Sequence, residues 1–285
     1  MSKSVAIITG ATGGMGMACS RLFAENHRLV LCDLSEEKLG ALVKQLQQKG
    51  ADVTGLCVDV SNREDIANLI VQSTSAGPIG ALIHTAGISP MMSDGKTIYE
   101  VNLIGTEYLL QSITPHMHDG AVAVLIASQA GTMAALESCH ELNQLLENSL
   151  ADDFYDRLEQ FEAAAGLSNA YGFSKLGVQL LAQKYAPQWG AQNARIVSLS
   201  PGIIDTPMGQ FENERQPIMK TLIEGTPLCR WGLSDEIATA VRFLCSPDAS
   251  FVTGTDLLVD GGATHAMLRS QASGDLIVPD KKELG

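Results

Sequence analysis

The sequence predicts an α/β protein built on a doubly wound parallel sheet of about seven strands, with helices on both faces and a helical insertion. Short runs of β-branched and aliphatic residues alternate with stretches of helical spacing over almost the whole chain. A glycine-rich segment, Gly10 to Gly16, follows the first run directly, and 285 residues suffice for one large core. Strands that alternate with helices favour a parallel sheet covered on both sides.

The predicted strands each have the length and composition of a buried strand. They span 5–9, 29–32, 53–60, 81–84, 122–127, 195–199 and 257–259. Helical spacing is clearest over 17–26, 36–48 and 63–73. Parallel strands place their carboxyl ends at one edge of the sheet, where ligands bind in this fold class. We therefore expect the residues that follow the strands to form the functional site.

One domain is predicted over residues 1–267, with the helical insertion at about 133–168 and a polar extension at 268–285. Within the insertion, apolar residues recur at steps of three and four, which predicts an amphipathic helix or a helical hairpin. This stripe comprises Leu142, Leu145, Leu146, Leu150, Phe154, Leu158 and Phe161. Two interpretations stay open: an apolar lid over a hydrophobic substrate, or packing against the core or a subunit partner.

Composition limits the class of partner. Thirty-two acidic against 19 basic residues give a formal net charge of −13, the wrong sign for binding a nucleic-acid backbone. No apolar run approaches the length of a membrane span, and the short polar start leaves no room for a signal peptide. The six cysteines lack the close pairing of a zinc site. We expect a cytoplasmic protein without a metal, nucleic-acid or membrane partner.

The glycine-rich segment has the composition of a phosphate-binding turn. Glycines allow a tight turn and bring backbone N–H groups against a pyrophosphate, and the following helix adds its positive N-terminal end. A position between the first strand and the first helix is typical of the Rossmann dinucleotide-binding fold. We assign the cofactor-binding role here to Gly10, Thr12, Gly14, Met15 and Gly16.

Asp33 ends the second predicted strand, where a carboxylate can accept hydrogen bonds from both adenosine-ribose hydroxyls and repels a 2′-phosphate. No Lys or Arg lies in the glycine loop or directly after Asp33, so NAD is favoured over NADP. The alternative is that Asp33 only caps the next helix, a role that Ser35 can fill instead. Leu34, Asp59 and Val60 are predicted to flank the adenosine.

Tyr171 and Lys175 are four residues apart, a spacing that puts both side chains on one face of a helix. An ammonium near a phenol favours the phenolate, so Lys175 is expected to lower the pKa of Tyr171, as acid/base catalysis at an alcohol requires. The spacing is common by chance, and a surface pair is the alternative. The upstream glycine loop favours the catalytic interpretation.

With these motifs the chain resembles the short-chain dehydrogenase/reductase family over nearly its whole length. The resemblance implies that Tyr171 is the catalytic acid/base and that Lys175 lowers its pKa and holds the nicotinamide ribose. Ser128 matches the serine that hydrogen-bonds the substrate oxygen, and Asn102 matches the asparagine that holds a proton-relay water. The implied reaction interconverts a secondary alcohol and a ketone, in a homodimer or homotetramer.

The resemblance also implies further cofactor contacts, at Ala86, Gly87, Pro201, Gly202, Ile204 and Thr206. His84 departs from the family pattern, in which asparagines usually precede Ala-Gly. We interpret His84 as a core histidine with satisfied hydrogen bonds, because Tyr171 already fills the acid/base role.

Ser128 and Tyr171 lie farther apart than in most compact family members, which is why an insertion is predicted. A similar insertion occurs in bacterial 3α-hydroxysteroid dehydrogenase/carbonyl reductases, and that resemblance favours a hydroxysteroid or other bulky apolar carbonyl. The segment 207–230 is expected to be a mobile substrate loop. Two rival functions stay open: a non-catalytic NAD-sensing regulator, and a dehydratase or epimerase that returns hydride to the same substrate.

Overall fold

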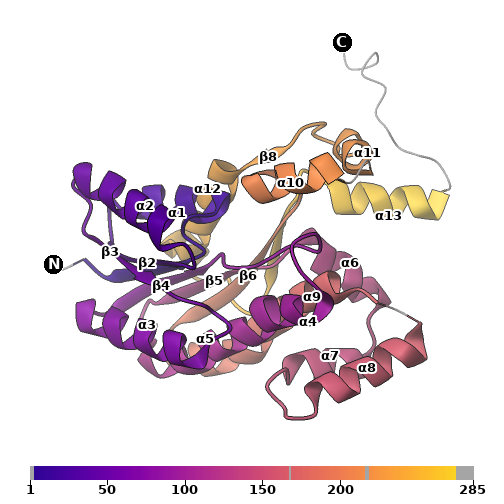
Figure 1. Ribbon diagram of the computed structural model, residues 1–285, viewed down its shortest axis with the longest axis horizontal. Helices are drawn as coiled ribbons and strands as arrows, with labels where there is room; N and C mark the ends of the chain where they lie inside the picture. The colour runs from indigo at the N-terminus through magenta and orange to yellow at the C-terminus, as the bar shows by residue number, and fades with distance from the viewer. Residues whose placement is uncertain (1–2, 167, 216–217, 274–285) are drawn as a thin grey trace.

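The computed structural model describes residues 3–166, 168–215 and 218–273. In these residues, seven parallel strands form one sheet in the order β3-β2-β1-β4-β5-β6-β9, and β7 pairs with β8 apart from it. Figure 1 shows this sheet between two layers of helices. The predicted Rossmann-like fold is therefore confirmed.

The strands of the main sheet match the predicted ones closely. They are β1 Val5–Thr9, β2 Arg28–Asp33, β3 Val53–Cys57, β4 Ile79–His84, β5 Val122–Ile126, β6 Arg195–Pro201 and β9 Asp256–Val259. The third strand is shorter than predicted, because the Asp59 carboxylate accepts hydrogen bonds from the N–H and Oγ of Ser61 and turns the chain. The short strands β7 Ile204–Asp205 and β8 Gly232–Leu233 were not predicted.

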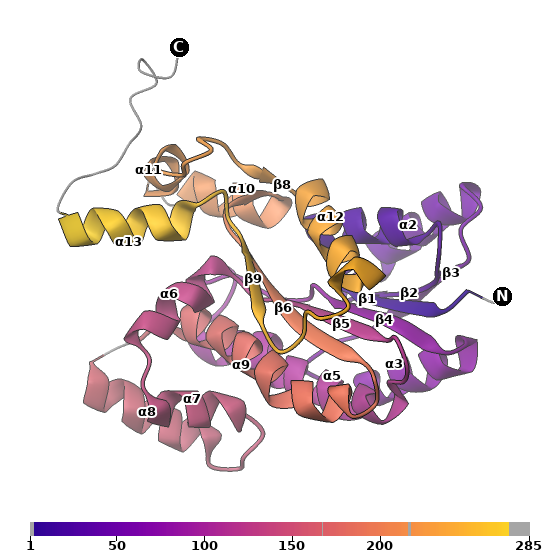
Figure 2. The same cartoon turned by 180° about the vertical axis from the view of Figure 1, so that it is seen from behind.

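Each face of the sheet has its own helices and its own core. One face carries α1 Gly14–Phe23, α2 Glu36–Gln48 and α12 Ser234–Cys245, and the other carries α3 Arg63–Ala76, α5 Gly105–Ile113 and α9 Ala170–Gly190 (Figures 1 and 2). Along β1, Val5 and Ile7 pack into one core cluster, and Ala6 and Ile8 into the other. Burial on both faces explains why the strands are continuous apolar runs.

The remaining helices connect or extend these layers. They are α4 Gly95–Tyr99, the π-helix η1 Glu100–Ile104, η2 Thr114–His116, α6 Gln129–Glu137, α7 His140–Glu147, α8 Phe154–Ala165, α10 Pro207–Arg215, α11 Ile218–Glu224, η3 Pro247–Ala249 and α13 Ala263–Ser273. Helix α13 crosses residue 267, where we predicted the domain to end, and residues 274–285 lie outside the described part. The segment predicted as a mobile substrate loop contains α10 and α11.

The insertion is a helical hairpin, α7 and α8, that packs on its own chain. Leu142, Leu146 and Phe154 are buried in the same core cluster as residues of α5 and α9, and Phe154 makes an edge-on contact with Tyr99 (ring centroids 6.0 Å apart). The apolar stripe is therefore buried against the chain's own core, which supports the packing interpretation over the lid. The insertion begins after α6 rather than at residue 133, because α6 runs to Glu137 and packs on α9.

An ion pair between α5 and α9 is also bonded to the hairpin. The carboxylate of Glu107, on α5, accepts hydrogen bonds from the Lys184 ammonium (2.7 Å) and the Ser149 hydroxyl (2.6 Å). Glu107 is buried, whereas Lys184 is partly exposed. Because a buried carboxylate needs such partners, Glu107 ties α9 and the insertion to α5.

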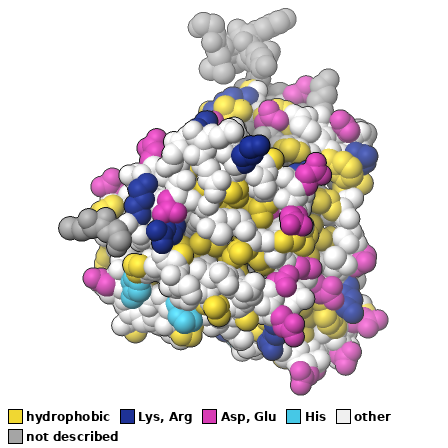
Figure 3. All heavy atoms as spheres, turned by 60° about the vertical axis from the view of Figure 1, so that its left-hand side comes forward, with side chains coloured by type: hydrophobic (Ala, Val, Ile, Leu, Met, Phe, Trp, Pro, Cys, Tyr) yellow, Lys and Arg dark blue, Asp and Glu magenta, His cyan; other side chains and the backbone are white. Residues whose placement is uncertain are grey.

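The surface is predominantly acidic, and acidic side chains are widespread on the face that Figure 3 shows. No helix in the described ranges is long and apolar enough to cross a membrane. Over the same residues, no group of three or more His, Cys, Asp or Glu side chains is arranged to hold a metal ion.

Candidate active site

The predicted catalytic residues converge at the carboxyl ends of the central strands. Ser128 follows β5 and begins α6, where its Oγ accepts a hydrogen bond from the N–H of Ala130 (3.1 Å). Helix α6 packs tightly on the first turns of α9, because a Cβ at Gly131 would lie 2.7 Å from the carbonyl carbon of Lys175. This contact brings the Ser128 side chain into hydrogen-bonding range of Tyr171.

Asn102 reaches the same place from the π-helix η1. Its Oδ1 accepts a hydrogen bond from the N–H of Ile88 (2.9 Å), and its Nδ2 donates to the carbonyl of Ile88 (3.0 Å) and to Ser174 Oγ (3.3 Å). A Cβ at Gly87 would lie 3.0 Å from Asn102 Oδ1 and 3.2 Å from Lys175 Nζ. Gly87 therefore lets the amide and the ammonium approach each other. Insertions of a π-turn recur at functional sites.

The pKa values of the central pair differ from the prediction. Burial raises the pKa of Tyr171 to about 12; the hydrogen bond with Ser128 lowers it, and the nearby charge of Glu212 raises it. Burial lowers the pKa of Lys175 to about 8, and its Nζ donates to the carbonyl of Ile126 (3.0 Å). The expected lowering of the tyrosine pKa by Lys175 is therefore wrong for the protein alone. Desolvation disfavours the charged form of both groups.

The glycine loop has the geometry of a phosphate cradle. Gly10 has a φ of +63°, and a Cβ there would lie 2.7 Å from the backbone nitrogen of Ala86. At Gly14 a Cβ would lie 2.7 Å from Thr206 Cγ2. Helix α1 starts at Gly14, earlier than predicted, and no side chain caps it. Its N-terminal N–H groups therefore suit an anion such as a pyrophosphate, and Met15 and Gly16 lie in this first turn.

Asp33 lies beside this loop. Its Oδ2 accepts a hydrogen bond from the N–H of Thr12 (2.8 Å), whereas Ser35 caps α2 by accepting from Lys38 N. The N-cap of α2 is therefore Ser35 and not Asp33, although Asp33 Oδ1 accepts a long bond from Ser35 N (3.4 Å). Leu34 follows and is exposed.

The two residues predicted to flank the adenine differ in their surroundings. Val60 is buried, and its carbonyl oxygen would lie 2.7 Å from a Cβ at Gly105. The Asp59 carboxylate is bonded to Ser61, as described above. Neither arrangement tests whether Asp59 and Val60 contact the adenine, so their role stays a prediction.

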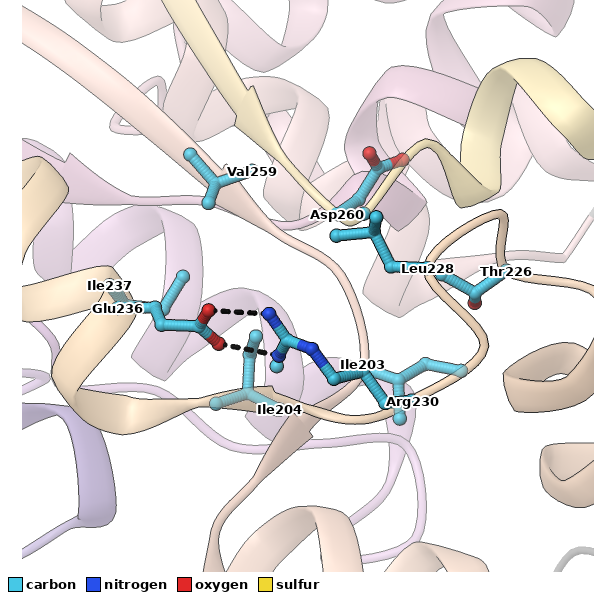
Figure 4. Close-up of a pocket in the computed structure, with 11 residues that line it drawn as sticks. Ile203, Ile204, Thr226, Leu228, Arg230, Glu236, Ile237, Val259 and Asp260 are labelled. Carbon is cyan, nitrogen blue, oxygen red and sulfur yellow. Dashed lines mark hydrogen bonds and ion pairs between the residues drawn. The ribbon is translucent and has the colours of Figure 1, made fainter. Parts of the chain in front are cut away.

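Residues 201–206 join the glycine loop to the opposite side of the site. The N–H of Gly202 donates to the carbonyl of Val259 (3.0 Å), and Thr206 Oγ1 accepts from Gly209 N (3.0 Å). Ile204 also lines a small pocket between β7, α12 and the end of β9, in which Arg230 and Glu236 form a two-pronged ion pair (Figure 4). That pocket contains none of the four predicted catalytic residues, so it is separate from the predicted reaction site.

His84 is at the centre of a buried chain of hydrogen bonds, in which the donor and acceptor of each bond can be assigned. Thr106 Oγ1 donates to the carbonyl of Asn102 (2.6 Å), so it accepts from His84 Nε2 (2.9 Å). Thr9 Oγ1 accepts from Ala86 N (3.2 Å) and therefore donates to His84 Nδ1 (2.7 Å). Burial lowers the pKa of His84 to about 3. The neutral imidazole thus links the cofactor loop to the π-helix, and the prediction of a satisfied core histidine is confirmed.

Two further polar residues border the site and were not predicted. Ser89 is buried at 1% exposure, two residues after Gly87. Glu212 extends from α10 and influences Tyr171 electrostatically. No sequence motif marks either position, since a serine and a glutamate in loop and helix segments are common.

Comparison with known proteins assigns the family. Residues 4–140 match the family model described as short chain dehydrogenase, and residues 160–264 match the one described as Enoyl-(Acyl carrier protein) reductase. The chain is 32% identical over 275 residues to a short-chain dehydrogenase/reductase of Alternaria brassicicola, covering 96% of this chain and all of that protein. The chain belongs to the short-chain dehydrogenase/reductase family.

Other members of the family are similar over comparable lengths. Galactitol 2-dehydrogenase (L-tagatose-forming) of Cereibacter sphaeroides is 29% identical, with 93% of this chain and 96% of that protein covered. The crystal structure of levodione reductase is 28% identical with a TM-score of 0.73, covering 93% of this chain and 99% of the other. As a member of this family, the protein is an oxidoreductase that uses a nicotinamide cofactor. The particular resemblance to hydroxysteroid dehydrogenases is not shown by these relatives.

Proposed function

We propose that the protein is a cytoplasmic, NAD(H)-dependent oxidoreductase that interconverts a secondary alcohol and a ketone. The observation that carries this proposal is the convergence of Asn102, Ser128, Tyr171 and Lys175 around Gly87 and the start of α9. A non-catalytic cofactor-binding protein has no need of a phenol, a hydroxyl and a buried ammonium at one point.

The side chains divide the proton chemistry among them. The nicotinamide, when bound, accepts or returns the hydride. Ser128 holds the substrate oxygen, and Tyr171 takes the hydroxyl proton during oxidation or gives it back during reduction. Because its pKa is about 8, Lys175 can exchange a proton at mildly basic pH. To Asn102 we assign the water that carries the proton onward.

NAD rather than NADP is proposed on the strength of Asp33. Its carboxylate lies beside the glycine loop, where Oδ2 accepts from the N–H of Thr12 (2.8 Å) and Oδ1 accepts a longer bond from the N–H of Ser35 (3.4 Å). Each oxygen has a second lone pair that a ribose hydroxyl can use. A 2′-phosphate at that point would meet a negative charge, and no Lys or Arg follows directly to neutralise it.

The substrate class is proposed more broadly than the sequence suggested. The interpretation as a hydroxysteroid or other bulky apolar carbonyl depended on the insertion as a lid, and the insertion packs on α9 instead. Galactitol 2-dehydrogenase is named for the oxidation of a secondary hydroxyl group in a polyol. That name supports a secondary alcohol without requiring a large apolar one.

Homodimer or homotetramer formation is also proposed, from the family resemblance. The resemblance implies contact through the helices that carry Tyr171 and Asn102. Because α7 packs against α9 and Ser149 bonds to Glu107 of α5, the insertion occupies part of that surface. We therefore expect subunit contact at another face, which light scattering combined with a cross-linking map would test.

The decisive experiment measures NADH absorbance with purified protein, NAD and a panel of secondary alcohols. Formation of NADH that is lost in Tyr171→Phe is the expected result. NAD binding without turnover of any alcohol would favour the NAD-sensing regulator. Isomerised or dehydrated product without net NADH would favour an epimerase or dehydratase.

A further inference from the structure

Ser89 is a buried polar side chain whose hydroxyl makes no hydrogen bond of ordinary geometry among the described residues. It is 1% exposed. Its position is held tightly, because the preceding residue, Ile88, is clamped on both its N–H and its carbonyl by the Asn102 side chain. Buried hydroxyls are normally satisfied, so an unpartnered one beside a catalytic amide suggests a missing ligand.

The Glu212 side chain, on α10, lies near this hydroxyl. The nearness of Ser89 lowers the pKa of Glu212, although burial raises it more, and the same carboxylate raises the pKa of Tyr171. Glu212 therefore lies near both Ser89 and the catalytic phenol. In Figures 1 and 2, α10 stands with α11 and α13 on one side of the strand ends, and α6 stands on the other.

The pair has the chemistry of a hydroxyl site. A carboxylate only accepts hydrogen bonds, whereas a serine hydroxyl donates one and also accepts. A ligand hydroxyl placed between them can donate to Glu212 and accept from Ser89, which satisfies both. An ammonium group can only donate, so it offers no acceptor to the Ser89 proton.

We infer that Ser89 and Glu212 bind a second hydroxyl group of the substrate, so that the preferred substrates are diols or polyols. This inference rests on the proposed function, since the second hydroxyl is defined relative to the one oxidised at Tyr171. A site built to bond a substrate hydroxyl discriminates strongly against the analogue that lacks it, because its polar groups are then left unpaired.

Initial rates with NAD test the inference on matched substrates. The probes are cyclohexanol, the 1,2-, 1,3- and 1,4-cyclohexanediols, and 2-aminocyclohexanol, with wild type, Ser89→Ala and Glu212→Gln. Glu214→Gln is the control, because it removes one charge from an exposed position of the same helix. Thermal melts establish that each variant is folded.

In the wild type, we expect at least one diol to exceed cyclohexanol in kcat/KM by about tenfold or more. That ratio should collapse in Ser89→Ala and Glu212→Gln and persist in Glu214→Gln. Oxidation of cyclohexanol without any diol preference would overturn this inference alone. A preference for the amino alcohol that Glu212→Gln removes would overturn it in favour of a cation site. Absence of NADH from every alcohol would overturn the proposed function as well.

Discussion

The edge of the sheet that holds the candidate site and the helical insertion are stabilised by different interactions. At the site, side chains bond to backbone groups at fixed positions: Asn102 clamps Ile88, and Lys175 donates to Ile126. In the insertion, Leu142 and Phe154 pack into a shared apolar core. Few residue types can fill a position that bonds to the backbone or lies very close to it, whereas many apolar residues can fill a position in a packed core. Only the first kind of region leaves a recognisable motif.

Lys175→Met should show the largest effect on catalysis. It removes an ammonium group whose burial costs folding stability and which the site therefore keeps for its function. Without the ammonium, alcohol oxidation should fall by a factor of about one hundred to ten thousand. Steady-state rates with NAD measure this loss, and an unchanged far-ultraviolet circular dichroism spectrum would show that the variant is folded. Retained activity would contradict the role assigned to Lys175.

The same variant should change how stability depends on pH. The pKa of Lys175 is about 8 in the folded protein against 10.5 for a free lysine, so the unfolded chain binds the extra proton between these values. Wild-type stability should therefore rise with pH from about 8 to 10.5, by up to about 3 kcal/mol. Urea unfolding at several pH values measures the slope, which should be absent in Lys175→Met. An equal slope in both proteins would refute the buried-lysine interpretation.

His84→Ala tests whether the hydrogen-bond chain positions the site. The change removes the acceptor for the Thr9 hydroxyl proton and the donor to Thr106 Oγ1, each at a cost of about 1–3 kcal/mol. We expect a lower free energy of unfolding together with a lower kcat, because the chain ends at Asn102 and Ala86. His84→Asn, which restores the residue type usual in the family, should recover part of both losses. A loss of stability with unchanged kcat would mean that His84 has a structural role only.

The outcome of the sequence predictions follows the same division. The glycine loop, Ser128, Asn102 and the Tyr171/Lys175 pair were predicted because each position requires one residue type. The contacts of the insertion were not predicted, since a stripe of leucines indicates a buried face without showing which helices cover it. Ser89 and Glu212 were missed because they meet only after α10 folds over the strand ends. The pKa of Tyr171 was predicted in the wrong direction, because burial is not visible in a spacing.

Glu107→Gln should loosen the insertion while leaving the cofactor region intact. The amide cannot replace the ion pair with Lys184, and hydrogen bonds to charged groups contribute about 1.5–3 kcal/mol. Hydrogen exchange should become faster over residues 139–166, with NAD affinity unchanged. Glu141→Gln, at an exposed position on α7, is the matched control. Faster exchange throughout the sheet would show that the two regions are not independent.

Asp33→Asn should give the smallest effect, a change in cofactor affinity only. The amide can still accept the hydrogen bond from Thr12 N, so the loop should keep its shape, but the charge that repels a 2′-phosphate is gone. We expect NADP affinity to rise about tenfold, the equivalent of about 1.4 kcal/mol, and NAD affinity to fall. Fluorescence titration with both cofactors measures the ratio. Asp152→Asn removes the same charge from an exposed position in the insertion and should leave the ratio unchanged, so a shift in both variants would mean that net charge, rather than Asp33, sets the preference.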